Sequence, residues 1–177
     1  MTHIRPATAA DLPAITAIYG HHVATGRASF EISPPPLEEM QRRHAALVAA
    51  GMPYLVAERE GVVLGYAYAG AYRPRIAYRD TVENSIYVAA EAAGQGIGRR
   101  LLEALLEACT ALGLRQMIAV VGDSANIASV KLHEAAGFRQ VGVLRSVGRK
   151  QGEWLDVVLL QRALGEGDTT PPGAEPG

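Results

Sequence analysis

The chain has 177 residues, a length that suits one domain with a well-buried core. Its 17 basic and 18 acidic residues nearly balance, which argues against nucleic acid or an anionic membrane as the partner and leaves small ligands. One cysteine excludes an intramolecular disulfide, and the sequence has neither an apolar run near the ~18 residues of a membrane span nor a signal-peptide pattern, so a cytoplasmic protein is expected.

The first third of the chain shows alternating extended and helical patterns. Residues 3–8 are predicted as a short strand, and the following helix has apolar positions at Leu12, Ile15, Ile18 and Tyr19. The stretch 20–36 contains two glycines and three consecutive prolines, so it is expected to end that helix and form a loop long enough to be functional. The next predicted elements are a helix at 37–50 and hairpin strands at 54–58 and 62–70.

Three arginines lie in the segment 72–79, directly before the central strand, among two tyrosines and a proline. A solvated charged segment is one interpretation of this pattern. The other interpretation is that these arginines bind an anion.

The central stretch of the sequence runs from Val82 to Arg100 and joins a strand, a glycine-rich turn and a helix. Alternation in the strand places Glu83, Ser85 and Tyr87 on one face. Glycines at 94, 96 and 98 let backbone N–H groups at the positive end of the helix approach an anion, usually a phosphate.

Two other phosphate-binding motifs fit this turn badly. A P-loop is excluded because no Lys-Ser or Lys-Thr pair occurs, and a dinucleotide fingerprint is disfavoured because the third glycine comes one residue too soon. A purely structural glycine turn stays open.

The remainder of the chain completes an α/β pattern. The helix is predicted to end near Leu112, with Cys109 in its apolar face as a core residue. Further elements are expected as a strand at 116–121, a helix at 127–136 and a hairpin of 139–149 with 153–161. Residues 1–164 are expected to form the single domain, and 165–177 a disordered tail. This order predicts an α/β layer protein with a mixed sheet.

Two motifs resemble the acetyl-CoA site of the GNAT superfamily of N-acetyltransferases. The first is the string E-A-A-G-Q-G-I-G-R-R after Ile86-Tyr87-Val88, and the second is Asn126-x-x-Ser129-x-x-Leu132-His133-Glu134-x-x-Gly137-Phe138. The superfamily loop is usually written Q/R-x-x-G-x-G/A, and Ala93 lies where Gln or Arg is expected. The resemblance implies the GNAT fold, in which α-helices flank a mixed central sheet whose central strands splay apart.

The same resemblance implies acetyl-CoA as co-substrate and no metal. Its pantetheine arm would pair with the strand and its pyrophosphate would lie on the glycine turn. The implied cofactor-binding residues are Ile86, Tyr87, Val88, Gly94, Gln95, Gly96, Ile97, Gly98, Arg99 and Asn126. Asn126 is also a preferred N-cap for the helix beginning at Ile127, and the two roles do not exclude each other.

Two residues are candidates for acid and base chemistry. Glu83 can take the proton from the attacking amine, directly or through one water; the alternative is a salt bridge to one of the preceding arginines. Many superfamily members place a tyrosine where this chain has His133, which can donate a proton to the departing thiolate, help to bind substrate, or be structural.

A longer set of motifs, covering about residues 3–163, resembles the phosphinothricin and methionine-sulfoximine N-acetyltransferase branch. These motifs are Arg73-x-Arg75-x-Ala77-Tyr78-x-x-Thr81-Val82-Glu83, Val120-x-Gly122, Ser129-Val130-x-Leu132-His133-Glu134-Ala135-x-Gly137 and Gly152-x-Trp154-x-Asp156-Val157. The branch acetylates the α-amine of glutamate-like amino acids bearing a phosphinate, sulfoximine or sulfone, and works as a homodimer.

The substrate-binding residues that this branch implies are Arg73, Pro74, Arg75, Glu83, Asn84 and Ser85. The two arginines can hold the anionic groups of the substrate by bidentate hydrogen bonds. Strand alternation points Asn84 away from Ser85 unless the strand bulges there.

Two other functions stay open. One is acetylation of protein N-terminal or lysine amines, which calls for an open acidic groove rather than an arginine-rich segment. The other is a non-catalytic acyl-CoA sensor, which would keep the glycine turn without needing Glu83.

Overall fold

The structure is a computed structural model that describes residues 1–173. Its strands are β1 (His3–Pro6), β2 (Tyr54–Arg59), β3 (Val62–Ala71), β4 (Thr81–Val88), β5 (Gln116–Gly122), β6 (Arg139–Lys150) and β7 (Glu153–Ala163). Its α-helices are α1 (Leu12–Thr25), α2 (Leu37–Ala49), α3 (Ile97–Ala111) and α4 (Ile127–Ala135), with short 3-10 turns η1 (Ala9–Asp11), η2 (Ile76–Tyr78) and η3 (Ala90–Ala92). None of the helices in this part of the chain is long and apolar enough to cross a bilayer.

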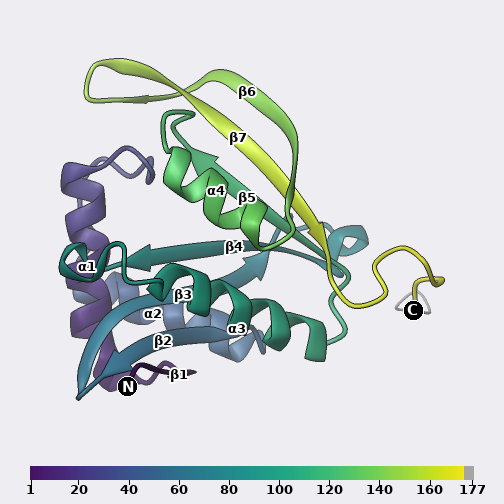
Figure 1. The fold of residues 1–177 in the computed structure, drawn as a ribbon, viewed down its shortest axis with the longest axis horizontal. Coiled ribbons are helices and arrows are strands. Elements are labelled where there is room, and N and C mark those ends of the chain that lie inside the picture. Colours follow the sequence, from purple (N-terminus) through teal and green to yellow (C-terminus); the bar gives the residue numbers. More distant parts are fainter. Residues whose placement is uncertain (174–177) are drawn as a thin grey trace.

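The strands form one mixed sheet in the order β1-β2-β3-β4-β5-β7-β6, with helices on both faces (Figure 1). Only β4 and β5 pair in parallel among the described strands. On one face, a Cβ at Gly65 of β3 would lie 3.3 Å from Leu101 of α3. On the other, the Tyr54 ring of β2 lies 4.9 Å from that of His44 in α2. The predicted α/β class with a mixed sheet is therefore confirmed.

The two parallel strands separate half-way along their length. Their pairing runs from Thr81 with Gln116 to Asn84 with Ala119 and, within the described chain, goes no further. Beyond that point β4 follows β3 as far as Val88, whereas β5 follows β7 as far as Gly122. The central strands are splayed, as the resemblance implied.

Sequence patterns also fix the local boundaries. The turn between β2 and β3 has positive φ at Glu60 (53°) and Gly61 (79°), as expected for a two-residue hairpin turn. In α3 the apolar stripe, Leu101, Leu102, Leu105, Leu106 and Cys109, is buried. Burial raises the pKa of the Cys109 thiol to about 12, in keeping with the predicted core position.

The prediction that the first helix ends at Gly20 is wrong, because α1 continues to Thr25. One glycine inside a helix costs only about 1 kcal/mol relative to alanine. Tertiary contacts of the last turns offset that cost: Val23 is 1% exposed, and His22 Nε2 donates to the Val88 carbonyl of β4 at 2.8 Å. The loop between α1 and α2 therefore spans only residues 26–36.

The segment expected to be a disordered tail begins at Gly165. Arg115 donates to the Gly167 carbonyl (2.5 Å) and to the carbonyl and hydroxyl oxygens of Thr170 (2.9 and 2.5 Å), which holds this first part beside the start of β5. Arginine is able to do this because its planar fork presents several donors at once. Residues 174–177 of the expected tail lie outside the described residues.

Asp11 is buried at the start of α1 and carries a dense set of hydrogen bonds. It accepts two from Arg5 at 2.8 Å and two from the backbone and hydroxyl of Thr8, at 2.7 and 2.9 Å. These bonds, those of Arg5 first, hold the pKa of Asp11 well below its usual value. We expect Asp11→Asn to lower the free energy of unfolding by about 1–3 kcal/mol at pH 7.

The sign of the pH effect follows from the depressed pKa. The Asp11 contribution is complete above its unfolded pKa of about 3.9 and is lost as the pH falls toward the folded value. Urea unfolding should therefore show a larger difference between wild type and Asp11→Asn at pH 7 than at pH 3. Asp168→Asn, at an exposed position, is the control. A cost that does not change with pH would contradict this account.

Candidate active site

A cavity of about 900 Å³ opens where β4 and β5 part. Its walls include β4 from Glu83 to Val88 and β5 from Ala119 to Gly122. One end reaches the glycine turn before α3 and the start of α4, which we call the turn end. The other reaches residues 28–31 of the α1–α2 loop, which we call the loop end. The cavity therefore passes through the sheet and connects its two faces.

The turn end is built for close approach to backbone N–H groups. Gly94 and Gly96 both have φ of 75°, and a Cβ added at either would meet no atom of the described chain within 4 Å. Gly96 is the N-cap of α3, so the N–H groups of the first helical turn have no partner within the helix. Free donors at the positive helix end suit an anion.

Not every predicted residue of this turn faces the cavity. Gly94, Gly96, Ile97, Gly98 and Arg99 line it. Gln95 is instead turned toward the chain: its Nε2 donates to the Glu91 carbonyl at 3.0 Å and its Oε1 accepts from Arg59 at 3.1 Å. Any role of Gln95 in binding would therefore use its backbone.

Asn126 closes the turn end from the α4 side. Its Oδ1 accepts from the Ser129 N–H at 3.3 Å, so the predicted N-cap of α4 is confirmed. Because Asn126 also lines the cavity, its amide group is placed to meet a ligand as well.

Alternation along β4 divides its side chains between the two faces of the sheet. Glu83, Ser85 and Tyr87 pair opposite Gly70, Tyr68 and Tyr66 of β3, on the α1 and α2 face. Asn84 points to the opposite face, where it meets His133 of α4. No register shift occurs between β3 and β4 here, so Asn84 and Ser85 are on opposite faces.

Glu83 lies at the last stretch where β4 and β5 still pair, opposite Ile118. Its carboxyl is half-buried and lines the cavity. Burial raises the pKa of Glu83, and the positive charge of Arg73 partly offsets this increase. A carboxylate with a raised pKa inside a cleft is a candidate proton acceptor.

His133 is buried between α4 and β4 with both ring nitrogens occupied. Nδ1 lies 2.8 Å from the Ser129 carbonyl and Nε2 lies 3.0 Å from Asn84. Burial lowers the pKa of His133, so the ring is neutral near pH 7, and its one proton is on Nδ1 because a carbonyl can only accept. Nε2 then needs a donor, whereas the Asn84 atom that faces it is the acceptor Oδ1. Exchanging the amide oxygen and nitrogen of Asn84 places Nδ2, which lacks a partner in the described structure, opposite Nε2 as that donor.

Comparison with known proteins decides the family. The sequence model of the acetyltransferase (GNAT) family matches residues 16–138. The chain belongs to the GNAT acetyltransferase family. A phosphinothricin N-acetyltransferase of Alcaligenes faecalis is 61% identical over 162 residues, which cover 92% of this chain and 82% of that protein.

Two further similarities point to the same branch of the GNAT family. An L-methionine sulfoximine/L-methionine sulfone acetyltransferase of Pseudomonas paraeruginosa is 43% identical, over 91% of this chain and 94% of that protein. The crystal structure of a GNAT superfamily phosphinothricin acetyltransferase from Sinorhizobium meliloti in complex with AcCoA has a TM-score of 0.94 and 49% identity, and covers 97% of this chain and 93% of that one.

Three of the substrate-binding residues expected for this GNAT chain lie outside the cavity wall. Arg73, Pro74 and Arg75 are exposed in the segment between β3 and η2. The Arg73 guanidinium carbon lies 4.9 Å from the centre of the Tyr72 ring. The segment leads into β4, two residues after η2, so it borders Glu83 without lining the cavity.

Sequence reasoning missed the residues that form the loop end. Tyr19, Ser29 and Glu31 line it, and the Tyr19 hydroxyl bonds to Ser29 Oγ (2.9 Å) and donates to Glu31 Oε1 (2.8 Å). Arg43 of α2 also donates to Glu31 Oε1, at 2.6 Å. Tyr19 follows the spacing of the core residues of α1, so the sequence pattern does not distinguish it from them. The only sequence signal for this part of the site is the long loop after the helix, because long loops are often functional.

We predict that His133 stays neutral at pH 7 and titrates below the usual value of about 6.5. Its charged form is disfavoured in the fold, so acidification through that range should also lower stability. Nitrogen NMR of the ring measures both the protonation and the tautomer, and His133→Gln identifies the signal by its loss. A ring that carries two protons at pH 7 would contradict the assignment.

Proposed function

We propose that this acetyltransferase moves the acetyl group of acetyl-CoA to the α-amine of a small glutamate-like amino acid, such as phosphinothricin, methionine sulfoximine or methionine sulfone. The observation that carries the proposal is the cavity through the sheet. It joins a turn with free N–H groups at one end to a half-buried carboxylate, Glu83, on the opposite face. The named activities of the relatives agree with it.

The residues at the turn end fit acetyl-CoA. The free N–H groups of Gly96, Ile97 and Gly98 suit a pyrophosphate. The edge of β4 beyond Asn84 leaves backbone groups for the amides of the pantetheine arm, in the manner of an added strand. Ile86, Tyr87 and Val88 are the residues of this edge, where the Val88 carbonyl already accepts a hydrogen bond from His22.

The reaction then needs a proton acceptor beside the thioester. In our proposal the carboxylate of Glu83 takes the amine proton, directly or through one water, while the amine nitrogen attacks the acetyl carbonyl. The carbon–sulfur bond breaks and CoA leaves as a thiolate, which takes up a proton. Both ring nitrogens of His133 already have partners, so we give it a supporting role rather than that of proton donor.

The amino-acid substrate would lie at the loop end, between Glu83 and the α1–α2 loop. Ser85 on the same face can add a neutral hydrogen bond. Arg73 and Arg75, together with Pro74, would reach the anionic groups of the substrate from the segment before β4. Asn84 would act from the other face by holding His133.

The test of the function is a panel of amino acids and analogues assayed for CoA release. Glutamate analogues bearing a phosphinate, sulfoximine or sulfone should have the highest kcat/KM. Peptides with free N-termini or lysines are the comparison set. Preference for the peptides would support protein acetylation, and CoA release with none of them would support an acyl-CoA sensor.

A homodimer is part of the proposal. Exposed apolar side chains on the β6–β7 hairpin, Val141, Leu144, Val147 and Trp154, support it, because a monomer gains nothing by exposing them together. Light scattering at micromolar concentration should give twice the chain mass of 18.8 kDa. A mass equal to that of one chain would contradict the proposed homodimer.

The role of the glycine turn is tested by Gly96→Glu. The added carboxylate would repel a pyrophosphate and cover the N–H groups, so acetyl-CoA affinity should fall by at least about tenfold in calorimetry. Gly51→Glu is the matched control, because Gly51 has a similar φ of 71° and equally open surroundings at the end of α2. Equal affinity in both variants would mean that the turn does not bind the cofactor.

The role of Glu83 is tested by Glu83→Gln, which keeps the shape and removes the proton acceptor. We expect kcat to fall by about 10²–10⁴ near pH 7, and the loss to shrink as the pH rises because more amine arrives deprotonated. Acetyl-CoA affinity should not change. Glu107→Gln, at an exposed position on α3, is the control. Wild-type turnover at every pH would remove Glu83 from the mechanism.

A further inference from the structure

Lys150, the last residue of β6, has a buried ammonium group although it lies beside a hairpin tip. The residue is 5% exposed. Its Nζ donates to the Val23 carbonyl and to the Ser29 carbonyl, each at 2.8 Å. Burying an ammonium group is costly unless hydrogen bonds replace its water. Lys150 therefore has a specific structural task at this position.

The two acceptors of Lys150 lie at either side of the bend that follows α1. Val23 is in the last turn of α1, where carbonyl groups have no partner within the helix and the helix dipole is negative. Ser29 is in the α1–α2 loop. One cation thus completes the C-terminus of α1 and holds the loop to the β6–β7 hairpin.

Phe30 provides a second attachment of the same loop. A Cβ at Gly148 of β6 would overlap the Phe30 ring, and one at Gly122 of β5 would lie 2.9 Å from Phe30 Cε1 and 2.6 Å from the Ala28 carbonyl oxygen. The absence of side chains at these two glycines makes a slot for the ring. Arg27 adds an exposed ion pair to Glu153 of β7, at 2.6 Å.

The residues held in this way form the wall of the loop end. Ala28, Ser29, Phe30 and Glu31 line the cavity, whereas Lys150 does not. Ser29 Oγ accepts from the Glu31 N–H at 3.2 Å and bonds to the Tyr19 hydroxyl, which in turn donates to Glu31. A shift of the Ser29 backbone would therefore move the Glu31 carboxylate.

We propose that Lys150 is a positioning residue for the amino-acid substrate. By clamping residues 26–31 against β6, it fixes the wall of the cavity opposite Glu83 and orients Glu31, whose carboxylate faces the substrate ammonium group. The clamp itself follows from the contacts of the free protein. The substrate effect rests on the proposed function.

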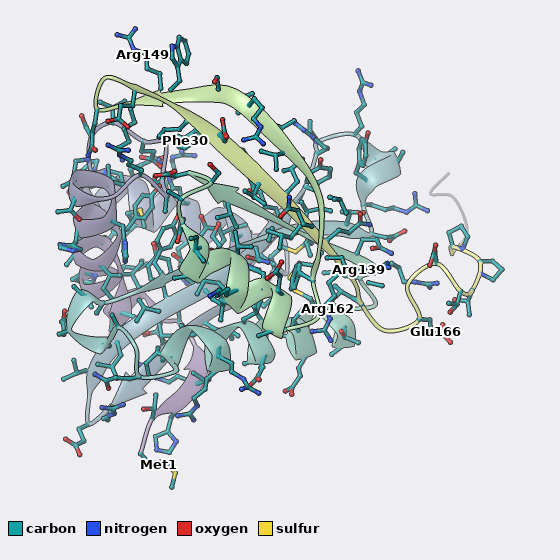
Figure 2. All side chains as sticks on the ribbon, turned by 45° about the horizontal axis from the view of Figure 1, so that its top comes forward. Met1, Phe30, Arg139, Arg149, Arg162 and Glu166 are labelled. Atoms are coloured by element: carbon teal, nitrogen blue, oxygen red, sulfur yellow. The ribbon has the colours of Figure 1, made fainter. Side chains whose placement is uncertain are left out.

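Lys150→Met tests the proposal, because methionine keeps most of the stem and removes the charge and the donors. KM for the amino acid should rise by about one to two orders of magnitude, as for loss of charge-assisted bonds. Acetyl-CoA affinity should stay within about twofold, and amides of residues 26–31 should exchange hydrogen faster. Arg149→Met is the matched control, because the Arg149 side chain projects away from the molecule (Figure 2).

Gly148→Ala is a second route that leaves Lys150 intact and displaces only the Phe30 ring. It should reproduce the faster exchange and the higher KM, whereas Gly142→Ala, where an added Cβ meets nothing within 4 Å, should not. If Lys150→Met does not fold, the comparison of Gly148→Ala with Gly142→Ala tests the proposal instead. Unchanged exchange and KM in the variants would overturn the proposal, and so would an equal loss of acetyl-CoA affinity.

The same experiment separates the two proposals. A wild-type protein that acetylates no amino acid overturns the proposed function and, with it, the effect of Lys150 on substrate. Faster exchange in Lys150→Met would still establish the clamp, because hydrogen exchange is measured on the free protein.

Discussion

The parting of β4 and β5 after Asn84 and Ala119 is the constraint on which the site depends. A sheet that stayed paired would fill this space with backbone hydrogen bonds and leave no passage. Each strand instead continues with its outer neighbour, β4 with β3 and β5 with β7, so the backbone stays paired on one side of each strand. The open sides provide walls with free polar groups, which a ligand can satisfy.

The direction of β4 then determines which functional groups line this passage. The strand runs from Glu83 through the parting to η3 and the glycine turn, so one continuous segment supplies both the carboxylate and the N–H groups before α3. Alternation directs Glu83 to the α1 and α2 face and Asn84 to the α4 face. Asn84 and His133 join β4 to α4 by a buried hydrogen bond at the point of separation. Neutral groups suit this position because a buried charge without a partner would destabilise it.

The loop end is assembled from elements that are distant in sequence. Tyr19 comes from α1, Glu31 from the loop, Arg43 from α2 and Lys150 from the far end of β6. Among them, Glu31 has its charge balanced by Arg43 at 2.6 Å, and Lys150 is balanced by two carbonyl dipoles. These contacts hold the loop in place together with the packing of Phe30, and they set the shape of the cavity on the side of Glu83.

The sequence by itself determined the order and type of the main elements, the hairpin turn at Glu60 and Gly61, the buried face of α3 and the glycine turn, because each depends on local periodicity or on backbone conformation. The splaying of the central strands was predicted only through the resemblance of the motifs to the GNAT superfamily. Tertiary structure alone decided that α1 continues past Gly20, since packing of Val23 and the bond from His22 outweigh a weak local preference. It also decided that His133 meets Asn84, that Arg73 and Arg75 stay outside the cavity wall, and that Lys150 holds the loop over it. Such contacts join residues up to 127 positions apart, which no local pattern in the sequence records.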